Sequence, residues 1–108
     1  FVLNRQLAAV CANFTIENMN KLVIAYEPVW AIGTGINATP DVIAETHKNI
    51  RDIIDDLGYN GLKVPILYGG SVSVNNAKKL SKIVGVNGFL IGGASLDVEK
   101  FYSIYKQL

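Results

Sequence analysis

Three glycine-bearing loops and one carboxylate are the parts of this 108-residue chain whose residue types and spacing could do chemistry. The loops are residues 27–35, 69–72 and 92–96, and each follows a short apolar run. Glycines expose backbone N–H groups that can bind phosphate or another small anion, and the Ser71 hydroxyl can add a donor. A single pair of glycines could serve only a tight turn, but three such loops on one face would favour an anion site.

Glu27 is the only carboxylate at the end of one of these apolar runs. A carboxylate between a buried strand and a glycine-rich loop could act as a general base, because partial desolvation strengthens a base. A solvated loop acid is the alternative. The long segment that follows contains Trp30 and Ile32 among glycines, a composition typical of a lid with small hinge residues.

Other chemistries have less support. Residues 33–38 formally match a dinucleotide-binding fingerprint, but residues 27–32 separate them from the preceding apolar run, and no acid ends a second strand where the fingerprint needs one. The sequence has no Walker A motif, no Cys and His cluster with metal-ligand spacing and no nucleophile elbow. We therefore expect no metal.

Composition and charge narrow the class of protein. Half of the residues are hydrophobic, and ten Lys or Arg against nine Asp or Glu leave a formal charge of +1. A disordered tail, a nucleic-acid binder and a membrane-surface binder are therefore not expected. No apolar stretch approaches the roughly 18 residues of a membrane span. The single cysteine, Cys11, cannot form an internal disulfide, which favours a reduced compartment such as the cytoplasm.

Three apolar runs predict the strands that position the loops. They extend from Leu22 to Tyr26, from Val64 to Tyr68 and from Gly88 to Ile91. Each is too short for a helix and is bounded by turn residues. Continuously apolar runs are typical of parallel strands, so we expect both faces of the sheet to be buried.

Helical periodicity surrounds these strands. The clearest helix begins at Thr39 as N-cap, with Pro40 at the first helical position, and ends at Gly58. Further helices are expected at residues 2–12, 76–83 and 97–107. This order predicts an α/β fold of parallel βα units, in which all three loops meet on one face. Such a sheet would have two unpaired edges, so we expect residues outside this sequence, which starts at Phe1 rather than Met, to complete it.

Several other side chains are expected to be structural. His47 lies within the predicted central helix, one turn before Arg51, where a structural or surface role is favoured over catalysis. Cys11 is expected to be a small core residue. The lysines between residues 78 and 82 are expected to form a solvated helix face.

Residues 25–35 read AYEPVWAIGTG, residues 68–72 read YGGSV, and residues 88–96 read GFLIGGASL. In this order and with this spacing, the three segments resemble the last three strand–loop motifs of the triosephosphate isomerase family. The first segment is a long and specific string. The resemblance covers essentially the whole chain and is weakest before Lys21.

The resemblance implies that residues 1–108 form the C-terminal part of a (β/α)8 barrel. It also implies the interconversion of dihydroxyacetone phosphate and glyceraldehyde 3-phosphate in glycolysis and gluconeogenesis, without a cofactor, in a cytoplasmic homodimer. Glu27 would be the base that moves a proton between the two substrate carbons. Gly33, Ser71, Gly92 and Gly93 would bind the phosphate.

The resemblance also implies a lid and a clamp on the base, formed by Pro28, Val29, Trp30, Ile32 and Leu90. The first three would be a hinge of a lid that extends to Ala38. Ile32 and Leu90 would press on the carboxylate and keep it dry.

This sequence departs from the family in three respects. Acidic residues are usual near Gly85 and at Asn87, so the structural ion pair that would engage Arg51 lacks its acid here. Ile36 replaces a more usual polar or basic residue at the second lid hinge, a change that could alter lid kinetics. The family's N-terminal lysine and electrophilic histidine lie on earlier strands, and His47 is not that histidine. We therefore expect an active parent protein and an inactive 108-residue piece.

Two alternatives stay open at this point. Another phosphate-binding (β/α)8 enzyme would share the glycine loops but not the string EPVWAIGTG. A non-catalytic half-barrel could instead bind a partner through its exposed sheet edges.

Overall fold

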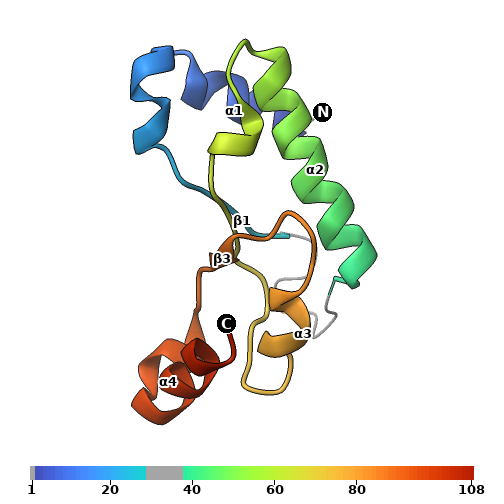
Figure 1. The fold of residues 1–108 in the computed structure, drawn as a ribbon, viewed down its shortest axis with the longest axis vertical. Helices are drawn as coiled ribbons and strands as arrows, with labels where there is room; N and C mark the ends of the chain where they lie inside the picture. The colour runs from blue at the N-terminus through green and yellow to red at the C-terminus, as the bar shows by residue number, and fades with distance from the viewer. Residues whose placement is uncertain (1, 29–37) are drawn as a thin grey trace.

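The computed structural model describes residues 2–28 and 38–108, which alternate between helices and strands (Figure 1). The helices are α1 (Val2–Cys11), α2 (Pro40–Asp56), α3 (Ala77–Ser81) and α4 (Val98–Lys106), and the strands are β1 (Ile24–Tyr26), β2 (Ile66–Tyr68) and β3 (Gly88–Phe89). Short 3-10 helices at Ile16–Lys21, Gly61–Lys63 and Gly93–Leu96 were not predicted. The predicted order of helices and strands is confirmed. The lid predictions for Val29, Trp30, Ile32, Gly33 and Ile36 fall outside the described residues.

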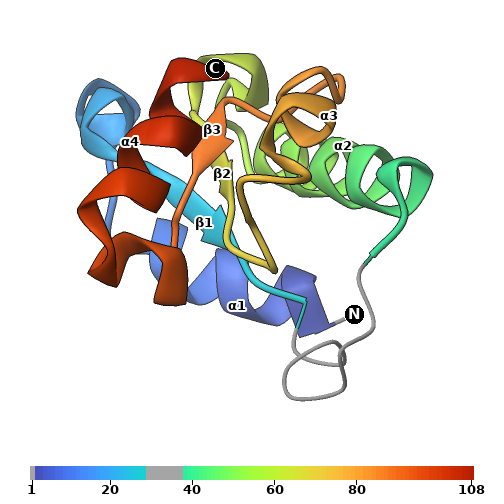
Figure 2. The same cartoon turned by 90° about the horizontal axis from the view of Figure 1, so that it is seen from below.

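The three strands form one parallel sheet in the order β1-β2-β3. Tyr26 pairs with Tyr68, and Tyr68 pairs with Phe89. The strands are shorter than predicted: β2 begins at Ile66 because the preceding Pro65 has no N–H to donate to a ladder. Figure 2 shows the three strands side by side.

Only one face of this sheet is well covered by the described residues. Ile66 and Tyr68 of β2 point to the helical side and are buried, whereas Ala25 of β1 points to the other side and is exposed. The expectation of burial on both faces is therefore wrong for this part of the protein. The alternating exposure arises because Ile66 and Tyr68 pack into core clusters with residues of the helices, whereas Ala25 belongs to neither cluster.

The predicted ends of α2 are confirmed. The Thr39 side chain accepts a hydrogen bond from the Val42 N–H at 3.3 Å, and Pro40 is the first helical residue. At the other end Gly58 has φ +95°, a conformation that favours glycine, and its N–H donates to the Asp55 carbonyl at 2.9 Å. Local sequence signals thus determine where the longest helix starts and stops.

The larger core cluster joins α1, α2 and the sheet, and it consists of Leu7, Cys11, Met19, Ile50, Ile54, Val64 and Ile66. Cys11 is a buried core residue, as predicted, and burial raises the pKa of its thiol. The Tyr59 hydroxyl donates to the Phe14 carbonyl at 2.6 Å, which fixes the segment after α1 against the end of α2. The core therefore anchors α1 and α2 to the sheet.

The described residues also leave large apolar side chains exposed. In Figure 1, α4 lies at the end of the molecule opposite α1. Leu96 and Val98, at the start of this region, are 90% and 84% exposed. None of the described helices has both the length and the apolar character to cross a membrane.

Candidate active site

The carboxyl ends of the three strands lie next to one another. The Gly69 N–H donates to the Tyr26 carbonyl at 2.7 Å, and the Leu90 N–H donates to the Tyr68 carbonyl at 3.0 Å. These bonds continue the ladder of hydrogen bonds one residue past the strands. Glu27, Gly69 and Leu90 therefore lie side by side at the ends of the three neighbouring strands.

Gly69 separates the predicted base from the predicted clamp residue. A methyl group at Gly69 would lie 3.8 Å from the Cβ atoms of both Glu27 and Leu90. Because glycine has no side chain, no side chain of residue 69 stands between Glu27 and Leu90. Both are exposed in the described part of the chain, and Pro28, which follows Glu27, is buried.

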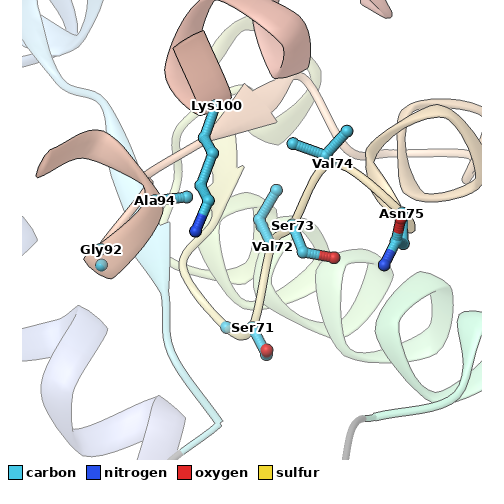
Figure 3. A pocket seen from close by; sticks show the side chains of 10 residues that line it. Ser71, Val72, Ser73, Val74, Asn75, Gly92, Ala94 and Lys100 are labelled. Carbon is cyan, nitrogen blue, oxygen red and sulfur yellow. The ribbon is translucent and has the colours of Figure 1, made fainter. Parts of the chain in front are cut away.

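The two loops after β2 and β3 come together as predicted. Residues 70–75 and 92–94, with Lys100, line a hollow of about 470 Å³ (Figure 3). Ser71, Gly92 and Gly93 are all exposed at its rim. The structure thus brings together three of the four predicted phosphate-binding residues, and the fourth, Gly33, lies outside the described residues.

Internal hydrogen bonds hold both loops in place. The Asn76 side chain accepts from the Ser73 N–H at 2.7 Å and donates to the Ser71 carbonyl at 2.9 Å. The Ser95 hydroxyl donates to the Gly92 carbonyl at 2.5 Å. The hollow is therefore built from braced backbone segments, an arrangement suited to an anion that is bound by N–H groups.

Gly70 is required for close packing, unlike the glycines at the rim. A Cβ atom at Gly70 would overlap the Tyr68 hydroxyl, whereas one at Gly92 or Gly93 would meet no atom within 4 Å. Burial raises the pKa of Tyr68, so its hydroxyl stays protonated. Gly92 and Gly93 are among the residues that line the hollow.

Glu27 faces a different depression. It is one of the residues that line an apolar groove of about 840 Å³, together with residues from α1 and β1. Glu27 and the hollow thus lie near each other at the carboxyl end of the sheet, with the Gly69 backbone between β1 and β3.

Lys100, in the first turn of α4, was missed by the sequence analysis. Its side chain lines the hollow beside Gly92 and Ala94 (Figure 3). A lysine a few residues past a glycine pair was the available signal, but sequence distance alone does not reveal which way the helix turns.

Arg51 bonds to uncharged partners instead of an acid. Its guanidinium donates to the carbonyls of Gly61, Val64 and Gly85 at 2.7, 2.9 and 2.9 Å, and to Asn87 Oδ1 at 2.6 Å. Arg51 therefore donates to neutral acceptors where the family resemblance implies an ion pair with an acidic residue.

His47 is fully buried between α2 and the sheet, so its structural role is confirmed and the surface alternative is wrong. Its Nδ1 lies 3.3 Å from the Gly85 carbonyl, which can only accept, so Nδ1 carries the proton. Its ring meets the Tyr26 ring edge-on, with centroids 5.9 Å apart. Burial, and secondarily the positive charge of Arg51, lowers the pKa of His47.

Two further predictions concern the lysines of α3 and the absence of a metal site. The lysines between residues 78 and 82 are exposed, as predicted for a solvated face. Across residues 2–28 and 38–108, no three His, Cys, Asp or Glu side chains are grouped so that they could hold a metal ion.

The family model described as triosephosphate isomerase matches residues 1–108. The chain belongs to the triosephosphate isomerase family. A triosephosphate isomerase of Francisella tularensis subsp. novicida is 46% identical over 107 residues, which are 98% of this chain and 42% of that protein. One of Bdellovibrio bacteriovorus is 55% identical over 88 residues, or 82% of this chain and 36% of that protein. The chain thus spans less than half the length of these relatives.

Membership of the triosephosphate isomerase family agrees with the observed architecture. The parallel strands and their crossover helices are consecutive βα units of a (β/α)8 barrel. In such barrels the active site lies at the carboxyl ends of the strands. That is the edge at which Glu27 and the hollow are found.

Proposed function

We propose that this chain supplies the base and the phosphate site of a triosephosphate isomerase. Family membership supports the activity, and the observation that carries the proposal is the alignment of Glu27, Gly69 and Leu90 beside the hollow. The family match favours this reading over other phosphate-binding (β/α)8 enzymes.

The proposed reaction moves protons without net oxidation. The Glu27 carboxylate removes a proton from C1 of dihydroxyacetone phosphate, and a proton is returned to C2, which yields glyceraldehyde 3-phosphate. A second proton passes from O1 to O2, for which the resemblance implies a histidine outside these residues. No proton or electron is gained or lost overall.

The phosphate would be bound at the hollow. Exposed backbone at Gly92 and Gly93 and the hydroxyl of Ser71 supply donors at one rim, and Gly33 would complete them from the lid. Leu90 and Ile32 would exclude water from Glu27, with Pro28, Val29 and Trp30 as the first hinge. We further propose that the parent protein is a homodimer, that it is located in the cytoplasm and that it acts in glycolysis.

Replacing the carboxylate by its amide tests this proposal. In the full-length protein, Glu27→Gln should lower kcat by about a hundred- to ten-thousandfold, because an amide cannot accept the proton. Glu27→Asp should also lower kcat but leave KM near the wild-type value, because the phosphate contacts remain.

A matched rim variant separates binding from proton transfer. Ser71→Ala should mainly raise KM, since it removes a donor from the hollow and leaves the base in place. Isomerase turnover by Glu27→Gln close to that of the wild type would contradict the proposed role. Residues 1–108 alone are expected to be inactive, because the implied histidine is not among them.

A further inference from the structure

We propose that Lys100 is a further phosphate-binding residue, which supplies a positive charge to the hollow from the first turn of α4. This inference rests on the proposed function, because it names a partner of the same substrate phosphate. It concerns a lysine of this chain and not the N-terminal lysine that the resemblance implies.

The first observation is the chemistry of the hollow. Its other lining residues, in segments 70–75 and 92–94, are glycines, serines, valines, an asparagine and an alanine, none of which is charged. Backbone N–H groups and hydroxyls bind any small acceptor, but they do not by themselves match a charge of −2. Lys100 is the one charged residue among those that line the hollow.

The second observation is the direction of the lysine side chain. Figure 3 shows Lys100 extending from α4 with its ammonium group between the Gly92–Ala94 segment and the Ser71–Val72 segment. A phosphate held by both loops would lie in this space. The stem of a lysine is flexible enough for the ammonium to follow the anion.

The third observation is that carboxylates near Lys100 do not neutralise it. The Asp97 carboxylate accepts from the backbone N–H of Lys100 at 3.0 Å and so caps α4. Within residues 2–28 and 38–108, the single ion pair is between Lys48 and Asp52. The ammonium of Lys100 is therefore available to an incoming anion.

The fourth observation is the room for such an anion. Apart from each glycine and its chain neighbours, no atom lies within 4 Å of the positions where side chains at Gly92 and Gly93 would begin. An anion can therefore contact this backbone directly while it lies under the lysine. This role predicts a contribution to substrate affinity, with no part in proton transfer.

The test compares three variants of the full-length protein, with inorganic phosphate as the probe. Lys100→Met removes the charge but keeps much of the stem, Lys100→Arg restores a charge, and Lys79→Met removes an exposed lysine of α3 that does not line the hollow. The dissociation constant of phosphate and its effect on the amide resonances of Ser71, Gly92 and Gly93 are measured by NMR titration.

Lys100→Met should weaken phosphate binding about tenfold, the loss expected for one hydrogen bond to a charged group. KM for the triose phosphate should rise in parallel while kcat stays near the wild-type value. Lys100→Arg should recover most of the affinity, and Lys79→Met should bind phosphate like the wild type.

Wild-type phosphate affinity in Lys100→Met would overturn the proposal, as would an equal loss of affinity in Lys79→Met. The proposed function fails separately, if the wild-type protein binds phosphate but does not isomerise the triose phosphate. Phosphate affinity and turnover thus report on the two proposals independently.

Discussion

The two ends of the parallel sheet are built in different ways. At the amino end, the Arg51 guanidinium gathers the carbonyls of Gly61, Val64 and Gly85. Asn87 Oδ1 accepts from Arg51 and also from the Ile66 N–H at 2.9 Å, which fixes the start of β2. Polar groups at this end are paired within the chain, an arrangement that serves stability.

At the carboxyl end, the chain leaves its polar groups accessible. Glu27, Ser71 and Gly92 are exposed there, and the loops after β2 and β3 enclose a hollow. The comparison shows that hydrogen bonds at the amino end of the strands stabilise the fold, while the polar groups at the carboxyl end stay free to bind a ligand. This division is typical of (β/α)8 barrels.

Removal of Arg51 should produce the largest change in stability. Arg51→Met removes four hydrogen bonds that a charged donor makes, so the free energy of unfolding of the full-length protein should fall by about 3 kcal/mol. Urea denaturation measures this change. The KM of the remaining folded protein should not change, because Arg51 does not line the hollow.

An exposed cation one turn earlier in α2, Lys48, provides the control for the half-buried Arg51. Lys48 is exposed and pairs with the exposed Asp52, so Lys48→Met should leave the urea midpoint close to that of the wild type. A similar loss in both variants would mean that general charge, and not the hydrogen bonds of Arg51, stabilises the amino end.

A pair of glycine substitutions compares the two ends directly. A Cβ atom at Gly61 would overlap the backbone carbonyl oxygen of Arg51, whereas one at Gly93 would meet open space. Gly61→Ala should therefore lower the free energy of unfolding by about 2 kcal/mol, as overpacking does. Gly93→Ala should leave stability almost unchanged and raise KM, because the methyl group occupies the hollow.

Urea denaturation and steady-state kinetics on both glycine variants check this prediction. The comparison of the two ends breaks down if Gly93→Ala is the less stable variant, or if Gly61→Ala alone raises KM.

The smallest expected effect is a pH dependence of stability from His47. Its pKa is lowered in the folded state, so the unfolded chain binds more protons between the folded pKa and the ordinary value of about 6.5. This contribution is complete above the unfolded pKa and is lost as pH falls toward the folded pKa. The loss amounts to about 1.4 kcal/mol for each unit of difference.

Denaturation between neutral and mildly acidic pH should show this slope in the wild type and a flatter one in His47→Gln. Glutamine is neutral throughout and can still donate to the Gly85 carbonyl. An identical slope in the two proteins would assign the acid sensitivity to other groups.

Features set by neighbouring residues could be predicted from the sequence. Thr39 and Pro40 start α2, and Gly58 stops it, because caps depend on a few adjacent residues. The placement of Glu27 and Ser71 on one edge follows from parallel strands.

Features set by contacts between distant segments could not be predicted. Arg51 finds acceptors at Gly85 and Asn87, which lie 34 and 36 residues further along the chain. The exposure of Ala25 depends on which layers cover the sheet, and the approach of Lys100 to the hollow depends on the direction of α4.

Hydrogen exchange at the substrate tests the central claim most directly, because it follows the proton that Glu27 is proposed to move. The full-length protein is incubated with dihydroxyacetone phosphate in D₂O, and deuterium at C1 of the recovered substrate is measured by NMR. The account predicts that the wild type introduces deuterium and that Glu27→Gln, although it unfolds at the wild-type urea concentration, does so at least about a hundredfold more slowly. Deuterium incorporation by Glu27→Gln at the wild-type rate would contradict the account.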